Sequence, residues 1–326
     1  MDVRFKAMNS TSIRPIAFWR LRTRTIELGA RTLVMGVVNI TPDSFSDGGR
    51  FLKPGAAIEH GLRLLEEGAD ILDLGAESTR PGSHAGDPAG AATVSAAEEQ
   101  DRLLPVLEGM LRERPGAIVS VDTYKAATAR AALAAGAEIV NDVSGFNWDP
   151  EMPAVCAGLA AGVVLMHTRG RPEEWRSQAQ LSAPELLATV REGLEQSLAA
   201  ANRAGISSDA IVLDPGYGFG KRFDENYALL GRQPELLALG RPLLAGVSRK
   251  SFLGRSLAPL FAGNDAPPDA RDNASLAAMV AAILGGASIV RVHAVRPAVE
   301  GARIADAILA AEKAGEDGSA QPQKAL

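Results

Sequence analysis

The 326-residue chain contains little cysteine, little histidine and few aromatic residues. Its one cysteine, Cys156, excludes an internal disulfide, and its small-residue surroundings predict a buried, unreactive thiol. Four dispersed histidines disfavour a histidine-rich metal cage. No run of eighteen apolar residues occurs, so we expect no membrane span. The net charge of −5 provides no general positive field for nucleic acid or anionic lipid. A cytoplasmic, globular protein fits these absences.

A motif of helix end, glycine and apolar strand recurs along the chain. It appears at 68–73, 136–141 and 286–291, each time as Gly-Ala followed by an apolar run that ends in a polar residue. Glycine ends a helix readily because positive φ costs it little. Together with similar apolar runs, the motif predicts eight strands, which end near positions 39, 73, 122, 141, 167, 214, 248 and 291.

Segments with helical spacing of apolar residues separate these strands. We expect helices near 55–67, 96–114, 125–135, 151–160, 183–204, 224–239, 273–284 and 296–310. Eight consecutive βα units favour a (β/α)8 TIM barrel, and a doubly wound open sheet is the alternative. We divide the chain into an N-terminal extension, a possible β-hairpin, at 1–30, a barrel at 31–312 and a flexible tail at 313–326. An organellar presequence is the less favoured interpretation of the Arg-rich extension.

The predicted carboxyl ends of the strands carry an unusual set of polar residues. In a barrel of this kind the active site lies at those ends. The set comprises Asn39, Asp73 and Glu77, Asp122, Asn141 and Asp142, Met166 and His167, Asp214, Ser248 to Lys250, and Arg291 and His293. Adjacent carboxylates and amides suit the edge of a planar heterocycle, where paired hydrogen bonds read donors and acceptors.

Cations at the same ends predict an anion site. Arg291 and His293 are two residues apart on a strand, so their side chains should face the same space. An arginine fork suits phosphate oxygens. The Gly-rich segment from Asp214 to Lys221 has neither the P-loop spacing nor GxGxxG, so we expect its glycines to allow close backbone approach to a ligand. A weak divalent-ion site shared with phosphates is compatible with the sequence.

Seven ordered motifs closely resemble the dihydropteroate synthase family of pterin-binding TIM barrels, in register from about Leu33 to Arg296. They are the segments 39–49, 77–82, 120–123, 141–145, 213–221, 248–251 and 290–293. The resemblance implies condensation of 6-hydroxymethyl-7,8-dihydropterin diphosphate with p-aminobenzoate, giving 7,8-dihydropteroate and diphosphate in folate biosynthesis. It further implies sulfonamide binding, Mg²⁺ and a homodimer through the last helices.

The resemblance also implies roles for individual residues. The pterin site would be formed by Asp122, Asn141, Met166, Asp214 and Lys250. The diphosphate site would be formed by Asn39, Thr79, Arg80, Arg291 and His293, with Asn39 near Mg²⁺. The p-aminobenzoate site would be formed by Thr79, Arg80, Pro81, Phe219, Lys250 and Ser251.

The expected chemistry is an SN1-like substitution without a covalent enzyme intermediate. Asp122 and Asp214 would stabilise positive charge on the pterin methylene, while Arg291, His293 and Mg²⁺ would stabilise the departing diphosphate. Lys250 completes the set of expected catalytic residues. Three positions depart from the family pattern: Ala294 stands where Asp is typical, Ala76 replaces Gly, and Thr168-Arg169 replaces Met-Gln. Weaker or differently supported diphosphate contacts are the consequence expected of Ala294.

Three other functions fit part of the pattern. A methyltetrahydrofolate-dependent methyltransferase would share the pterin recognition but has no need for the motifs at 79–81 and 248–251. A barrel aldolase would use Lys250 as a Schiff-base amine. A non-catalytic paralogue would bind pterins only.

Overall fold

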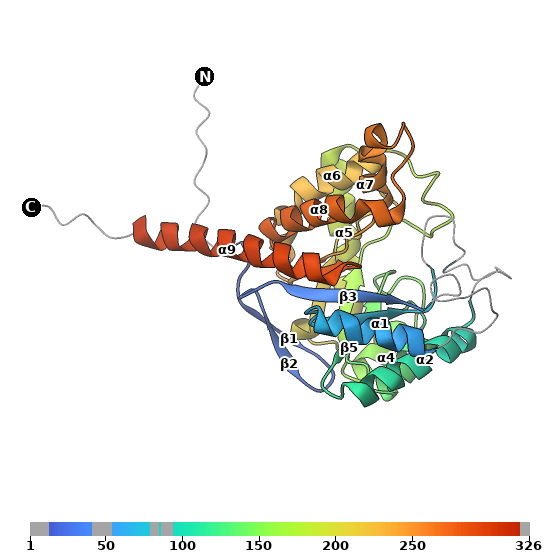
Figure 1. Ribbon diagram of the computed structural model, residues 1–326. Coiled ribbons are helices and arrows are strands. Elements are labelled where there is room, and N and C mark those ends of the chain that lie inside the picture. Colours follow the sequence, from blue (N-terminus) through green and yellow to red (C-terminus); the bar gives the residue numbers. More distant parts are fainter. Residues whose placement is uncertain (1–12, 41–53, 79–84, 86–93, 320–326) are drawn as a thin grey trace, which may run out of the picture.

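The computed structural model describes residues 13–40, 54–78, 85 and 94–319. In it eight parallel strands close a barrel in the order β10-β3-β4-β5-β6-β7-β8-β9 (Figure 1). The strands are β3 (Leu33–Asn39), β4 (Ile71–Gly75), β5 (Ile118–Asp122), β6 (Ile139–Asp142), β7 (Gly162–Met166), β8 (Ile211–Asp214), β9 (Leu243–Ala245) and β10 (Ala287–Val292). The TIM barrel is thus confirmed, and the open sheet is excluded by the pairing of β10 with β3.

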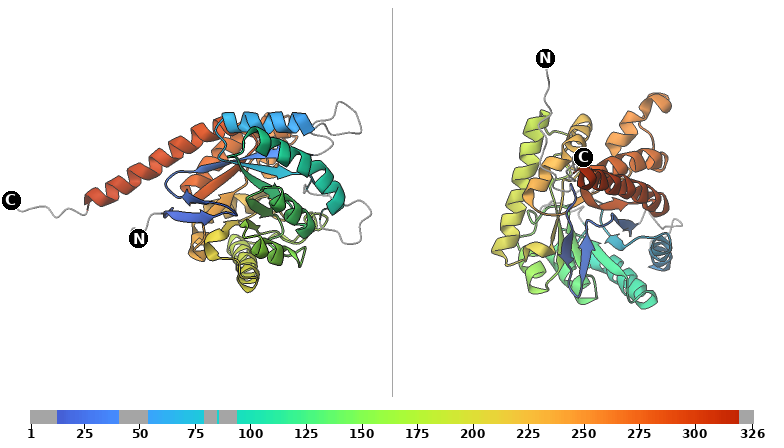
Figure 2. Two further views of the ribbon diagram at one scale, coloured as in Figure 1. Left: turned by 90° about the horizontal axis from the view of Figure 1, so that it is seen from below. Right: turned by 90° about the vertical axis from the view of Figure 1, so that its left-hand side faces the viewer.

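Helices on the outside of the barrel connect the strands (Figures 1 and 2). They are α1 (Pro54–Glu66), α2 (Ala96–Glu113), α3 (Ala126–Ala134), α4 (Met152–Gly158), α5 (Ala183–Arg203), α6 (Phe223–Gly231), α7 (Ser251–Ser256), α8 (Asp272–Leu284) and α9 (Val295–Ser319). Short 3₁₀ helices are η1 (Ser208–Ala210), η2 (Gln233–Leu239), η3 (Ala258–Leu260) and η4 (Pro268–Arg271). None of the helices within these ranges is long and apolar enough to cross a membrane.

Local sequence explains where helices begin and break. In α5, the Glu185 carboxylate accepts from the Ser182 backbone N–H at 2.9 Å, and Leu186, Val190 and Leu194 form the buried stripe. The helix expected over 224–239 is interrupted instead. α6 ends at Gly231 and the chain continues as η2, because a residue before proline, here Gln233 before Pro234, disfavours the α conformation.

The N-terminal extension contains the expected hairpin. β1 (Ala17–Arg20) pairs antiparallel with β2 (Thr25–Leu28). Trp19, Leu21 and Leu28 are buried against inward-facing residues from the first halves of the barrel strands. The Trp19 indole N–H donates to the Ala210 carbonyl at 2.9 Å. The hairpin therefore closes the amino-terminal end of the barrel and leaves the carboxyl end for the site.

The last helix runs further than the sequence indicated. We expected it to end near Ala310, whereas α9 continues to Ser319 and projects beyond the barrel (Figure 2). Ile304 and Ile308 on this helix are exposed, at 64% and 42%. The prediction for Cys156 is confirmed, since the residue is buried in α4, and burial raises the pKa of its thiol.

Candidate active site

An ion-paired cluster occupies the carboxyl end of the barrel. Arg291 on β10 donates from Nε to Asp73 at 2.6 Å and from an Nη to Asp122 at 2.7 Å. Asn141 donates its amide N–H to the same Asp73 oxygen at 3.0 Å. We call Asp73, Asp122, Asn141 and Arg291 the carboxylate cluster. Four different strands bring these residues together, as the pattern of strand ends predicted.

Asp73 has a more central place than the sequence suggested. Its polar position at a strand end was evident, but no role followed from it. The residue is fully buried, and its Oδ1 is one of two buried polar side-chain atoms in the described structure without a hydrogen-bond partner. A buried acceptor of this kind is rare without a reason. A ligand with an N–H donor entering the barrel would satisfy it.

Burial and neighbouring charges shift the pKa values of Asp122 and Arg291. Burial raises the pKa of Asp122 to about 7, with Arg291 opposing and Asp73 adding to that rise. Burial disfavours the charge of Arg291, but Asp73 and Asp122 outweigh it and keep the pKa above its usual value. Arg291 is therefore a permanent cation between two carboxylates, and Asp122 is the group able to change protonation state near neutrality.

Asp214 and Lys250 flank the cluster. Asp214 ends β8 and accepts from the Gly216 backbone N–H at 2.7 Å, and burial raises its pKa. The Lys250 ammonium lies 3.8 Å from the centre of the Phe219 ring. Burial, helped by Arg291, lowers the pKa of Lys250 to about 7. Met166 packs beside them in an apolar group with Tyr124, Val143 and Phe219. Met166 and Phe219 thus form a flat apolar wall, and Asp214 and Lys250 form a charged rim. This arrangement suits a planar ligand.

The glycine-rich loop after β8 packs closely against His167, the residue that follows β7. Gly216 has φ +71°, and a Cβ there would lie 1.9 Å from the His167 carbonyl oxygen. The buried Lys221 ammonium donates to that carbonyl at 2.9 Å and contacts His167 Nδ1 at 2.8 Å. Arg169, one of the departures from the family pattern, donates to the Gly220 carbonyl at 3.2 Å. Close backbone packing, which sequence spacing does not reveal, thus positions Phe219.

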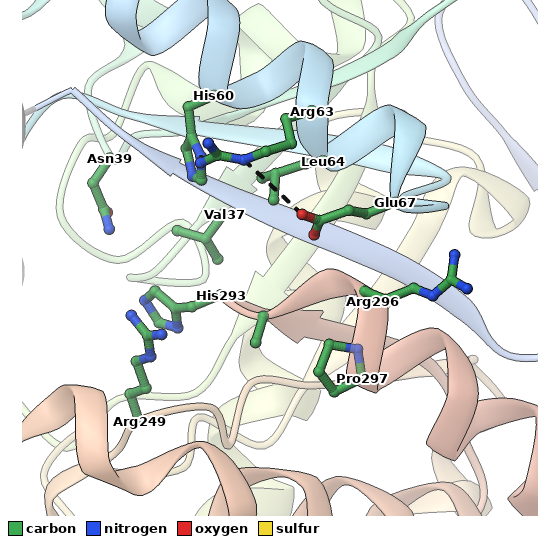
Figure 3. A pocket seen from close by; sticks show the side chains of 11 residues that line it. Val37, Asn39, His60, Arg63, Leu64, Glu67, Arg249, His293, Arg296 and Pro297 are labelled. Atoms are coloured by element: carbon green, nitrogen blue, oxygen red, sulfur yellow. Dashed lines mark hydrogen bonds and ion pairs between the residues drawn. The ribbon is translucent and has the colours of Figure 1, made fainter.

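Asn39 and His293 lie apart from the carboxylate cluster, in a pocket of about 520 Å³ (Figure 3). α1 and the first turn of α9 form its walls, and Arg249 lies beside the His293 ring in Figure 3. Arg291 and His293 were expected to share one space, yet Arg291 turns to Asp73 and Asp122 while His293 lines the pocket. The two predicted halves of the site, heterocycle and anion, are therefore adjacent but distinct.

Other predicted residues have simpler positions. Ser251 is the exposed first residue of α7, a helix that the sequence did not predict. Asp142 was named at a strand end, but its carboxylate accepts from the Ser144 and Phe146 backbone N–H groups, so it caps a turn. Thr79, Arg80 and Pro81 lie outside the described residues, as do 41–49 of the first motif.

The described residues can be compared with the ligand sets that hold metal ions. Within residues 13–40, 54–78, 85 and 94–319, no group of three or more His, Cys, Asp or Glu could hold one. Magnesium commonly retains waters and uses one or two protein ligands together with substrate phosphates. The Asn39 amide oxygen at the pocket suits this arrangement, as one protein ligand beside substrate phosphates.

Comparison with known proteins agrees with this geometry. The profile of the family described as "Pterin binding enzyme" matches residues 35–293. Dihydropteroate synthase from Mycobacterium leprae is 44% identical over 283 residues, covering 85% of this chain and 93% of the relative. The chain therefore belongs to the pterin-binding enzymes.

Solved structures narrow the class. The Yersinia pestis dihydropteroate synthase with a sulfonamide drug complex has a TM-score of 0.79 at 37% identity, covering 90% of this chain and 99% of that one. The Xanthomonas albilineans enzyme with 4-aminobenzoic acid has a TM-score of 0.77 at 40% identity, covering 91% and 99%. Within the pterin-binding enzymes, the chain belongs with the dihydropteroate synthases, transferases of folate biosynthesis.

Proposed function

We propose that the chain joins 6-hydroxymethyl-7,8-dihydropterin diphosphate to p-aminobenzoate and releases diphosphate, with the carboxylate cluster as the pterin site. The observation that carries this proposal is the partnerless Asp73 oxygen beside Asp122, Asn141 and Arg291. A pterin presents adjacent N–H donors and ring acceptors along one edge. Such an edge can satisfy carboxylates and an amide at once, which a fatty chain cannot.

The reaction breaks the bond between the pterin methylene carbon and the diphosphate oxygen. The electron pair leaves with the oxygen, and the p-aminobenzoate nitrogen then bonds to the methylene and loses a proton to solvent. Asp122 and Asp214 would stabilise the positive charge that develops on the pterin side. Asn39 and His293 would receive the departing diphosphate. Carboxylates fixed in advance on the side where positive charge develops, and N–H donors fixed on the side of the leaving oxygen, stabilise the charges that develop, which is usually the largest catalytic contribution.

Lys250 lies where both substrates would meet. Its ammonium packs on the Phe219 ring. Its pKa of about 7 lets it bind and release a proton near neutral pH. We propose that it donates to the pterin and faces the aminobenzoate, with Met166 against the ring and Ser251 near the carboxylate. Thr79, Arg80 and Pro81 would contribute from the other side of the aminobenzoate.

Magnesium, dimerisation and location complete the proposal. Mg²⁺ would bind with the diphosphate at Asn39 and neutralise negative charge on the leaving group. The exposed Ile304 and Ile308 on α9 support a homodimer through the last helices. Folate synthesis from soluble substrates supports a cytoplasmic location.

The direct test is turnover. Purified protein would be incubated with the dihydropterin diphosphate and Mg²⁺, with and without p-aminobenzoate, while dihydropteroate and diphosphate are measured. We expect both products together and only with p-aminobenzoate, with inhibition by a sulfonamide that competes for the aminobenzoate site. Methyl transfer from methyltetrahydrofolate without dihydropteroate formation would favour the methyltransferase alternative. Pterin binding without any product would favour a non-catalytic paralogue.

A further inference from the structure

The Ser248 hydroxyl contacts His293 twice. The His293 backbone N–H donates to Ser248 Oγ at 3.2 Å, and the same oxygen lies 3.0 Å from His293 Nδ1. Ser248 is only 7% exposed and follows β9, while His293 follows β10, the neighbouring strand. One buried hydroxyl therefore connects the segments that leave two adjacent strands and fixes the ring relative to its own backbone.

The hydroxyl hydrogen decides the direction of the second contact. The oxygen accepts the backbone N–H and keeps its own hydrogen to donate, and among the described residues Nδ1 of His293 is the acceptor that it reaches. A neutral imidazole that accepts at Nδ1 carries its proton on Nε2. The groups around the ring favour neutrality: burial, Arg291, Arg249 and Lys250 lower the His293 pKa to about 3, against a smaller opposing effect of Asp272.

The pocket in front of His293 gives this tautomer a use. Its three arginines already have acidic partners: Arg63 with Glu67 at 3.9 Å, Arg249 with Asp272 at 2.7 Å and Arg296 with Glu300 at 2.9 Å. Arg63 also contacts His60 Nδ1 at 2.7 Å. An anion entering the pocket therefore meets cations whose charge is largely balanced. Oriented N–H donors then matter more for binding geometry, and Asn39 and His293 supply them (Figure 3).

We propose that Ser248 is a positioning residue that holds His293 as the Nε2–H tautomer, so that the ring presents a neutral donor to an oxygen of the leaving diphosphate. This inference rests on the proposed function for its ligand, though not for the tautomer. A neutral donor orients the leaving group but binds diphosphate less tightly than an imidazolium would, which favours product release. The methyl group of Ala294, the next residue, can perform no such orientation, so in this chain the orientation of the ring falls to Ser248.

The tautomer can be measured without substrate. Protein with isotope-labelled histidine would be examined by NMR, and the His293 signals assigned by their loss in His293→Asn. We expect the Nε2–H tautomer in the wild type and in Ser248→Thr, which keeps the hydroxyl. Ser248→Ala should give a mixture of tautomers. Ser197→Ala, which removes another buried serine hydroxyl on α5, serves as the control and should leave the His293 signals unchanged.

Binding links the tautomer to the reaction. Calorimetry with inorganic diphosphate and Mg²⁺ should show affinity about tenfold weaker in Ser248→Ala, the loss of one oriented hydrogen bond. The KM for p-aminobenzoate should stay unchanged, and Ser248→Thr should restore diphosphate binding. An Nδ1–H tautomer in the wild type, or unaltered His293 signals in Ser248→Ala, would overturn the inference. The expected tautomer together with no diphosphate binding by the wild type would overturn the diphosphate assignment and the proposed function, while the tautomer itself stood.

Discussion

The two ends of the barrel are built from the same strands but from opposite chemistry. The apolar residues Ile71, Ile139, Val212 and Ile289 lie in the buried layer beneath the hairpin, which we call the floor. Two positions further along the same four strands are Asp73, Asn141, Asp214 and Arg291, which we call the mouth. A spacing of two keeps a side chain on the same face of a strand, so both layers point inward.

The contrast separates stability from function. Burying the floor stabilises the fold, because each fully buried aliphatic or aromatic side chain contributes about 1.5–3 kcal/mol. Burying the mouth does the reverse, since removing charges from water is costly even when they are paired. Burial raises the pKa of Asp214 in the mouth and of Asp122 beside it, which is a sign of that cost. A fold retains a buried charged layer where a ligand uses it. The stability contributed by the floor offsets the cost of burying those charges.

The largest expected effect is at the mouth. Arg291→Met leaves Asp73 and Asp122 buried without their cation, so we expect turnover to fall by about 10³-fold. The free energy of unfolding should also fall by about 3–5 kcal/mol. Steady-state kinetics and urea denaturation measure the two losses. Arg191→Met, which removes an exposed arginine from α5, is the control. Turnover within tenfold of the wild type would remove Arg291 from the mechanism.

The hairpin that packs on the floor should show the complementary behaviour. Trp19→Ala removes a buried ring and its hydrogen bond to Ala210, with an expected loss of about 3–5 kcal/mol in the free energy of unfolding. Turnover per folded molecule should not change. The neighbouring Phe18→Ala is the matched control, because Phe18 is 61% exposed. A selective loss of turnover in Trp19→Ala, at unchanged stability, would break the division between floor and mouth.

The pH dependence sharpens the assignment of Asp122 and Lys250, the two titrating groups beside the mouth. Asp122 must be ionised to accept from the pterin, so kcat/KM should fall as the pH drops below its pKa of about 7. Lys250 must be protonated to donate, so kcat/KM should also fall as the pH rises above its pKa of about 7. The result is a narrow bell near neutrality that belongs to the coupled pair. Lys250→Met should lose the alkaline limb, and a flat profile in the wild type would contradict both roles.

The smallest expected effect concerns the wall of the aminobenzoate pocket. Phe219→Leu removes the ring beneath the Lys250 ammonium, an interaction worth about 0.5–2 kcal/mol. We expect the KM for p-aminobenzoate to rise by a few-fold, with pterin binding retained. Phe223→Leu, which removes an exposed ring beside Arg255, is the control. If pterin affinity falls instead, Phe219 serves the mouth and not the second substrate.

Sequence patterns predicted the barrel and most of its strand ends because both depend on local repetition. The strand expected to end near position 248 is the exception, since β9 ends at Ala245. The glycine that follows several helices and the polar residue that follows most apolar runs are visible without a structure. The hairpin was predicted in outline as well. The break between α6 and η2 was missed because apolar spacing continues through Pro234, although a residue before proline carries the signal.

Side-chain pairing across the barrel was not accessible from sequence. The spacing of Arg291 and His293 predicted a shared strand face, but β10 ends at Val292, so His293 lies beyond the strand and the two side chains reach different partners. Arg291 reaches Asp73, 218 positions away in the chain. The importance of Asp73 and Ser248 likewise depends on contacts between distant segments. The positions of Thr79, Arg80 and Pro81 remain predictions.

The central claim is that the mouth, and Asp214 within it, binds the pterin while the floor does not. Calorimetry with dihydropterin diphosphate and Mg²⁺ tests it directly by comparing the wild type with Asp214→Asn, and with Asp209→Asn, an exposed aspartate, as control. We predict one pterin site per chain, weakened by about tenfold or more in Asp214→Asn and unchanged in Asp209→Asn. Equal affinity in all three proteins would place the pterin outside the mouth and contradict the account.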